Sequence, residues 1–130
     1  MSTIFTKIMN REIPGRIVHE DERCVAFLDI APQTEGHVLV VPREEIDHWT
    51  DMPEDLAAHV FGVAQRIGKA QRRAFGSKRV GLEIVGFDVP HAHVHVFPTN
   101  EIADHDLGRA KPASDESLDA AAEKLRAALA

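Results

Sequence analysis

The sequence contains a single cysteine, Cys24, which excludes an internal disulfide. Its first fourteen residues, MSTIFTKIMNREIP, lack the long apolar stretch of a signal peptide, so we expect a cytoplasmic protein. Long apolar runs are also missing. The strongest one, residues 38–41, is far shorter than the roughly 18 residues that a membrane span needs. We therefore expect a soluble chain that does not act in a membrane.

Positive charge is in short supply as well. Fifteen Lys and Arg stand against 21 Asp and Glu, for a formal net charge of −6. This balance argues against a general electrostatic grip on nucleic acid or anionic lipid. Any phosphate must be held locally. The 130 residues, 44% hydrophobic and 28% charged, have the size and balance of one globular domain.

Local patterns predict a sheet and two helices. Pro53 is suited to the first turn of a helix, the apolar residues after it recur at steps of three and four, and Gly76 can end it. Ser114 can cap a second helix near the C-terminus. Five strands are expected, at residues 17–19, 24–28, 37–41, 80–85 and 91–97. This order predicts an α+β fold with an antiparallel five-stranded sheet, one long helix and a C-terminal helix.

Histidine is concentrated in one segment. His91, His93 and His95 alternate with small or β-branched residues, and alternate side chains of a strand share a face. We therefore expect the three imidazoles on one face, with neighbouring Cα atoms about 6.6 Å apart. The intervening residues would face the core: Ala92, Val94 and Val96.

Three interpretations of this histidine segment are open from the residues alone. The histidines could be merely solvated, although triple alternation is unlikely by chance. They could chelate a metal, with His37 as a further ligand, but no Cys pair, no acid within the run and no HEXXH spacing supports this. A third interpretation is covalent catalysis at phosphorus. A neutral imidazole can attack an anionic phosphoryl group, and its neighbours can supply protons or hydrogen bonds.

At these residues the sequence resembles the histidine triad (HIT) family. The resemblance covers roughly residues 3–98 and is carried by four groups of residues: Phe5, Lys7 and Ile8; residues 26–33; residues 36–42; and residues 91–97. It implies a single HIT-like domain over residues 1–130, with a core at about 3–98 and a C-terminal extension at 99–130. Family members bind nucleotides and hydrolyse or transfer nucleoside monophosphate groups without a metal in the chemical step. They are usually homodimers joined into one continuous sheet.

The resemblance also implies roles for four histidines. The middle one, His93, corresponds to the nucleophile. His95 corresponds to a phosphate-contacting residue, and His91 to a structural and orienting one. His37 matches a supporting histidine on the neighbouring strand. The residues alone would favour a packed strand-end histidine at that position.

The nucleotide-binding residues are implied in the same way. Asp29 matches the acid that accepts hydrogen bonds from both ribose hydroxyls. Phe27, Leu28 and Ile30 correspond to apolar walls around the base. Without the resemblance, Asp29 would be a turn-opening residue, and simple core packing would explain any one of the three apolar residues equally well.

The sequence departs from the family pattern in three places. Phe87 and Asp88 stand where relatives commonly carry an amide and a hydroxyl residue, and a carboxylate beside the phosphate would repel it. The glycine-rich loop ahead of the motif is shortened. Where many bacterial relatives have a zinc-binding Cys-x-x-Cys, this chain has Thr3 and Thr6, which cannot replace thiolates. We therefore expect no zinc and no cofactor.

Together, the motifs predict a nucleotide hydrolase or nucleotidyl transferase. Its expected substrate is a purine nucleoside phosphoramidate or dinucleotide, attacked at the α-phosphate through a nucleotidyl-histidine intermediate. The expected partners are that nucleotide, or the corresponding monophosphate, and a second copy of the chain. The departures at Phe87 and Asp88 support an alternative, a nucleotide-binding or sensing module with weak or no catalysis.

Overall fold

The computed structural model describes residues 2–130, which form one sheet, three α-helices and three short 3-10 turns. The helices are α1 (Ile4–Met9), α2 (Glu54–Phe75) and α3 (Asp115–Leu129); the strands are β1 (Ile17–Glu20), β2 (Cys24–Leu28), β3 (Val38–Pro42), β4 (Arg79–Glu83) and β5 (Val94–Thr99); the turns are η1 (Trp49–Asp51), η2 (Ile102–His105) and η3 (Leu107–Arg109). All strand pairs are antiparallel, in the order β1-β2-β3-β5-β4. This arrangement confirms the predicted α+β class. No helix in the described range is both long and apolar enough to cross a membrane.

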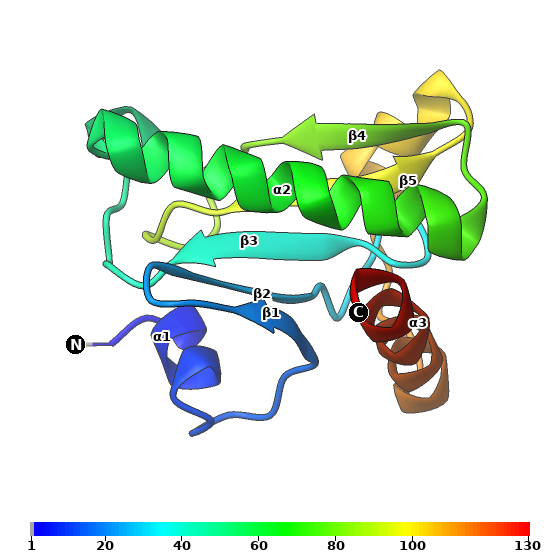
Figure 1. The fold of residues 1–130 in the computed structure, drawn as a ribbon, viewed down its shortest axis with the longest axis horizontal. Coiled ribbons are helices and arrows are strands. Elements are labelled where there is room, and N and C mark those ends of the chain that lie inside the picture. Colours follow the sequence, from blue (N-terminus) through cyan, green and yellow to red (C-terminus); the bar gives the residue numbers. More distant parts are fainter. Residues whose placement is uncertain (1) are drawn as a thin grey trace.

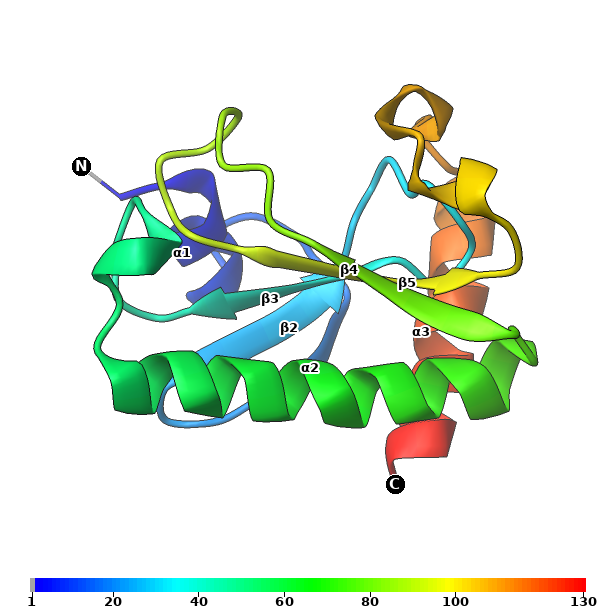
Figure 2. The same cartoon turned by 90° about the horizontal axis from the view of Figure 1, so that it is seen from above.

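The long helix α2 lies across one face of the sheet, and α1 lies on the other (Figures 1 and 2). Acidic residues occupy the first turn of α2, arginines occupy its last turn, and Gly76 ends it with a left-handed φ of 62°. The core between α2 and the sheet also takes in α3, through Leu118 and Leu125. Burial of one apolar stripe explains why the helical period in the sequence was a reliable signal.

The opposite face of the sheet carries the histidines. The strand register places Ile17, Phe27, Leu39, His95 and Glu83 in one row across the five strands. Directly opposed residues in a sheet point to the same side. The α1 residues Phe5 and Met9 cover part of this row in a second apolar cluster. The sheet therefore separates a structural core under α2 from a face that carries functional groups.

Leu28 was expected to form part of the apolar wall around the base, but its side chain lies on the α2 side of the sheet. It is 4% exposed and packs in the core with Val38 and Val96. Its neighbour Phe27 points the other way, toward Phe5. Since successive strand residues alternate between faces, Phe27 and Leu28 cannot line the same pocket.

The histidine strand begins later than predicted. β5 starts at Val94, so His91 and His93 precede it and only His95 is a strand residue. The His91 amide donates to the Val89 carbonyl, and the Ala92 amide donates to the Ile46 carbonyl. Because these groups bond to loops, the chain cannot continue a sheet ladder there. The sequence also did not predict α1 or the 3-10 turns between residues 99 and 113.

Candidate active site

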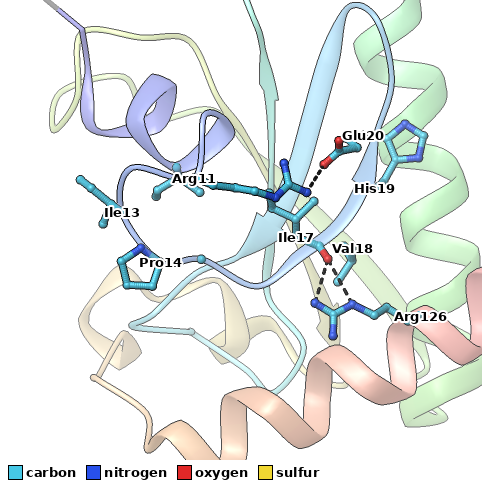
Figure 3. Close-up of a pocket in the computed structure, with 10 residues that line it drawn as sticks. Arg11, Ile13, Pro14, Ile17, Val18, His19, Glu20 and Arg126 are labelled. Atoms are coloured by element: carbon cyan, nitrogen blue, oxygen red, sulfur yellow. Dashed lines mark hydrogen bonds and ion pairs between the residues drawn. The ribbon is translucent and has the colours of Figure 1, made fainter.

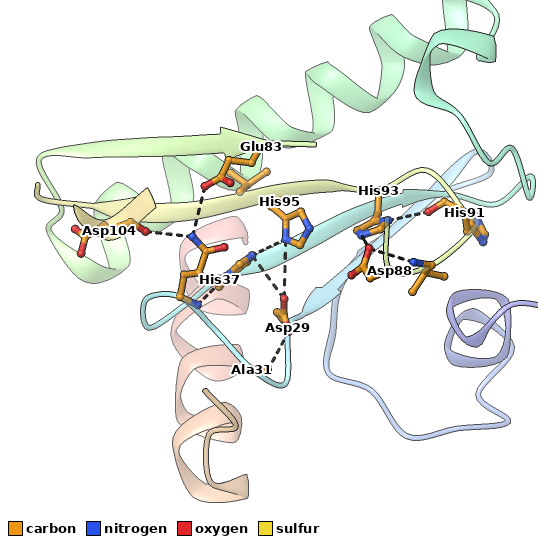
Figure 4. A network of polar contacts seen from close by, with 12 residues as sticks. Asp29, Ala31, His37, Glu83, Asp88, His91, His93, His95 and Asp104 are labelled. Atoms are coloured by element: carbon orange, nitrogen blue, oxygen red, sulfur yellow. Dashed lines mark hydrogen bonds and ion pairs between the residues drawn. The ribbon is translucent and has the colours of Figure 1, made fainter. Parts of the chain in front are cut away.

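The buried rings of His91 and His93 are oriented by main-chain carbonyls. His91 Nε2 lies 2.7 Å from the Pro42 carbonyl oxygen. His93 Nδ1 lies 2.7 Å from the carbonyl oxygen of His91, a contact drawn in Figure 4. A carbonyl only accepts, so His91 carries a proton on Nε2 and His93 carries one on Nδ1. The Thr3 hydroxyl, 2.7 Å from His91 Nδ1, donates to the remaining lone pair of that ring. In neutral His93, Nε2 therefore keeps a free lone pair.

A second chain of hydrogen bonds orients His95. The Gln33 amide donates to His37 Nδ1 over 3.0 Å, so His37 carries its proton on Nε2. That nitrogen lies 2.9 Å from His95 Nδ1 and donates to it. The His95 proton is therefore on Nε2. In this way one backbone N–H, acting through His37, determines which edge of His95 can donate.

The free edges of His93 and His95 are neighbours. Their ring centroids lie 5.0 Å apart. Both Nε2 atoms are buried and have no hydrogen-bond partner among residues 2–130. Buried polar atoms are normally paired, so two adjacent unpaired nitrogens indicate a ligand site. One offers a lone pair and the other a proton, as a nucleophile and a phosphate-oxygen donor would.

Burial keeps three of these rings neutral. It lowers the pKa of His37 to about 3, with a further contribution from the neighbouring His95. Burial likewise lowers the pKa of His91 and of His95. The tautomers assigned above apply to neutral rings, so this environment preserves them at neutral pH.

Asp29 stands at the end of β2, beside the two paired histidines. One of its oxygens accepts from the Ala31 amide over 2.9 Å. The other lies 3.7 Å from His37 Nε2 and 4.0 Å from His95 Nδ1, too far for a hydrogen bond. Burial raises the pKa of this carboxyl. Its second oxygen is therefore available to accept from a ligand.

Asp29, His37 and His95 also have the composition of a metal site, and their ligand atoms lie within 4.8 Å of one another. In the structure, however, His37 Nδ1 accepts from the Gln33 amide, and the facing nitrogens of His37 and His95 hydrogen-bond to each other. We call this chain of hydrogen bonds, from the Gln33 amide through His37 to His95, the relay. A metal ion at this position would have to break it. The geometry therefore favours the relay over metal binding.

Phe87 and Asp88, the two residues that differ from the family pattern, lie differently with respect to the site. Asp88 Oδ1 lies 3.4 Å from His93 Nε2, at the free edge of the ring. Phe87, next to it, is 96% exposed. Ile30 is also largely exposed, at 67%, whereas Phe27 is buried against Phe5. Of the apolar residues predicted around the base, Phe27 and Ile30 remain candidates.

Comparison with known proteins identifies the family of the chain. The chain matches the HIT domain family over residues 10–102. The chain belongs to the HIT family. It is 37% identical over 102 residues to an uncharacterized HIT-like protein from Methanocaldococcus jannaschii, a match that covers 75% of this chain and 79% of that protein. HIT membership supports a nucleotide-binding hydrolase or transferase at a general level.

Two crystal structures of HIT proteins share the fold over almost the whole chain. One is a Hit-like protein involved in cell-cycle regulation from Bartonella henselae, with a TM-score of 0.85, 32% identity and coverage of 98% of this chain and 96% of that one. The other is a zinc-bound histidine triad family protein from Mycobacterium smegmatis, with a TM-score of 0.82, 33% identity and coverage of 99% and 94%.

The threonines that replace the zinc-binding cysteines of many HIT relatives form a hydrogen-bonded cluster. Thr3 Oγ1 lies 2.7 Å from His91 Nδ1, and Thr6 Oγ1 donates to Glu45 over 2.7 Å. Glu45 also accepts from the Thr3 amide. These hydroxyl oxygens lack the thiolate chemistry of a structural zinc site, so the donor set does not fit that metal. Here Thr3 orients His91 directly.

A sizeable surface hollow lies elsewhere, beside β1. It measures about 520 Å³ and is lined by residues such as Arg11, Ile13, Pro14 and Arg126 (Figure 3). The Arg126 guanidinium donates to the Ile17 carbonyl at its edge. It holds none of the predicted site residues, so the volume of a hollow does not locate the candidate active site in this protein.

Three contributors to the site were not predicted from the sequence as site residues. They are Gln33, which acts through its backbone amide, Thr3, and Phe5, whose ring packs edge-on against His93 at 4.8 Å. Phe5 belongs to the family pattern, which was a usable signal. The roles of Gln33 and Thr3 depend on contacts between distant segments, and no local pattern reveals them.

Proposed function

We propose that this HIT protein is a hydrolase or nucleotidyl transferase that acts at the α-phosphorus of a purine nucleoside phosphoramidate or dinucleotide. The observation that carries the proposal is the pair of buried, unpaired nitrogens. His93 Nε2 offers a lone pair, and the adjacent His95 Nε2 offers a proton. We also propose a cytoplasmic homodimer, in keeping with the family resemblance.

In the first step, His93 Nε2 forms a bond to phosphorus. The bond from phosphorus to the leaving group breaks, and its electron pair departs with the leaving group, which takes up a proton. The His95 N–H donates to a non-bridging phosphoryl oxygen, where it stabilises negative charge. Gln33 and His37 keep that N–H in place through their hydrogen bonds.

In the second step, water attacks the same phosphorus. The bond to His93 breaks, its electron pair returns to Nε2, and one proton of the water is released. The product is the nucleoside monophosphate. Another nucleophile in place of water would make the reaction a transfer.

We assign the nucleoside half of the substrate to the face beside β2. The free oxygen of Asp29 is suited to ribose hydroxyls, since a carboxylate only accepts. Phe27 and the exposed Ile30 supply apolar surface for the base. Leu28 is not part of this assignment, because it packs in the core under α2.

Replacement of His93 by Ala tests the proposal. We expect the variant to lose turnover of adenosine 5′-phosphoramidate while it retains AMP binding by calorimetry. Intact-mass measurement of the wild type, quenched during turnover, should detect an adenylyl adduct that the variant lacks. His59→Ala, which removes a histidine on α2, is the matched control and should keep its turnover. Unchanged turnover in His93→Ala would refute the covalent role.

One observation favours the alternative, a nucleotide-binding module. The Asp88 carboxylate, 3.4 Å from His93 Nε2, stands where a phosphoryl group would approach. Tight AMP binding by the wild type, together with no hydrolysis of phosphoramidates or dinucleotides, would decide for this alternative.

A further inference from the structure

A cluster of polar side chains lies at the end of the β1–β2 hairpin, on the face of the sheet that α2 covers. Three of its members are of types that bind metal ions: His19 in β1, Asp21 in the turn and Cys24 at the start of β2. Cys24 packs in the core under α2, so the cluster lies on the opposite face from His95. None of its members takes part in the proposed reaction.

An irregularity in β1 turns His19 toward the α2 face. The strand register pairs Ile17 with Phe27. Two residues further along β1, it pairs His19 with Ala26, so β1 contains one extra residue. Such a β-bulge shifts the alternation of side chains by one position. Ala26 belongs to the core under α2, and opposed residues point to the same side, so His19 points there as well.

Three groups converge on one oxygen of Asp21. His19 Nε2 lies 2.7 Å from Asp21 Oδ2, and Cys24 Sγ lies 3.6 Å from it. His59, on α2, hydrogen-bonds to the same oxygen over 2.9 Å. The other oxygen, Oδ1, accepts from the Arg23 and Cys24 amides over 2.8 and 2.9 Å. These amides fix the carboxylate, so that Oδ2 stays between the His19 nitrogen and the Cys24 sulfur.

The spacing of these atoms is close to that of a metal site. One nitrogen of His19, one oxygen of Asp21 and the sulfur of Cys24 lie within 4.8 Å of one another. Bonds of about 2.0–2.3 Å place the ligand atoms of a tetrahedral zinc ion roughly 3.3–3.6 Å apart. Small side-chain movements would therefore bring the three atoms around one ion. Imidazole, thiolate and carboxylate are all ligands that zinc accepts.

The charge and exposure of the cluster also suit a cation. No lysine or arginine forms a salt bridge with the Asp21 carboxylate within residues 2–130, and its ion-pair partners there are histidines alone. The side chains of His19 and Asp21 are 22% and 25% exposed, which gives an ion access from solvent. Cys24 is fully buried behind them. A cation that entered would meet an uncompensated carboxylate first and the sulfur next.

We propose that His19, Asp21 and Cys24 form a binding site for a zinc ion that ties together the end of the β1–β2 hairpin. Binding releases the thiol proton of Cys24, and the His19 ring carries its proton on Nδ1, which leaves Nε2 for the metal. A water molecule completes the tetrahedron. We expected no zinc only on the basis of Thr3 and Thr6, which belong to a different part of the molecule.

Cobalt(II) tests the site, because it takes the coordination geometry of zinc and absorbs light. A thiolate bound to cobalt gives a sulfur-to-metal charge-transfer band in the near ultraviolet. Cys24 is the only cysteine of the chain, so this band reports on this cluster alone, even if cobalt also binds to the triad histidines. We expect cobalt chloride, titrated into the reduced wild type, to give the band and to saturate it at one ion per chain. Zinc chloride added afterwards should remove the band.

Variants of the three ligands sharpen the test. Cys24→Ala should lose the band, and His19→Gln and Asp21→Asn should weaken cobalt binding at least tenfold, since even partners outside the coordination shell contribute that much. His105→Ala, which removes an exposed histidine outside the cluster, is the matched control and should leave the band unchanged. Circular dichroism checks that each variant is folded. Independently of the spectrum, zinc should raise the Tm of the wild type and of the control but not that of Cys24→Ala.

Two results would overturn the inference. One is the absence of the charge-transfer band in the wild type, whether or not cobalt binds to other histidines. The other is a band that keeps its full affinity in both His19→Gln and Asp21→Asn, because Cys24 would then bind the ion with different partners. Neither measurement depends on turnover, so the outcome is independent of the proposed function.

Discussion

Gln71 offers the sharpest test of how the fold supports the site. This side chain of α2 is fully buried, and its amide donates to the carbonyls of Gly36 and Val96, each over 2.8 Å. Gly36 precedes His37, and Val96 follows His95. One amide therefore ties the segment just before β3, which carries His37, to β5, which carries His95. Its own oxygen is buried without a partner in the described structure.

Replacement of Gln71 by Met would leave two buried carbonyls without their donor, at a cost of about 1–3 kcal/mol each. Removal of the unpaired amide oxygen offsets about 1–3 kcal/mol of this. We therefore expect the free energy of unfolding to fall by about 2 kcal/mol. Turnover should fall as well, because the two strands are no longer held at the level of the relay.

Gln71→Glu separates the hydrogen bonds from side-chain shape. An ionised carboxylate would face two carbonyls with no proton to donate, so the pKa of Glu at this position should rise above its usual value of about 4.3. As pH rises above that value, the unfolded chain loses the proton while the folded chain keeps it. The free energy of unfolding should therefore fall relative to the wild type, by up to about 1.4 kcal/mol per pH unit.

Urea unfolding followed by circular dichroism, at several values between pH 5 and pH 8, measures this dependence. Gln65→Glu is the matched control, because it places the same acid on an exposed position of α2. If the two variants show the same pH dependence, Gln71 is not the buried donor described here.

Three further predictions concern stability and nucleotide binding. Burial holds the pKa of His37 at about 3, so between that value and about 6.5 the unfolded chain binds a proton that the folded chain does not. Acidification from pH 6.5 should thus lower the free energy of unfolding by up to about 1.4 kcal/mol per unit, and His37→Phe should flatten that slope in urea titrations. Leu28→Ala should lower the free energy of unfolding by about 2–4 kcal/mol but leave the AMP dissociation constant unchanged. Ile30→Ala should weaken AMP binding with little effect on the free energy of unfolding. The opposite pattern would show that Leu28, and not Ile30, lines the pocket. Asp21 accepts hydrogen bonds from the Arg23 and Cys24 amides over 2.8 and 2.9 Å and contacts His19 and His59. Asp21→Ala should therefore lower the free energy of unfolding by about 2–3 kcal/mol in urea titrations. A loss below about 0.5 kcal/mol would contradict a stabilising role of these contacts.

Local sequence patterns were sufficient for much of the fold. The helical stripe of α2 and the apolar runs of β2 and β3 predicted their elements, because burial of one face imposes a period on the chain. The apolar period did not single out Gln71, which the structure buries on the same helix. The six-residue α1 was missed, since it is stabilised by the Thr3 cap and by the packing of Phe5 and Met9 rather than by a long repeat.

The site was only partly accessible from the sequence. The alternating pattern predicted that His93 and His95 lie close together, and their ring centroids are 5.0 Å apart. It placed the start of β5 too early, because hydrogen bonds between loops replace those of the sheet before Val94. The proton positions on the rings depend on a carbonyl at Pro42 and an amide at Gln33. Such contacts join segments far apart in the chain and leave no periodic signal.

The C-terminal segment has a more direct connection to the histidines than its place outside the motif suggests. The Gln33 side chain donates to the Asp104 carbonyl and to Glu83, while its main-chain amide donates to His37 Nδ1 (Figure 4). The Ala113 amide donates to the Ile30 carbonyl. We therefore expect truncation or exchange of this segment to change the turnover rate, because it would displace Gln33 and with it His37, although every histidine stays in place.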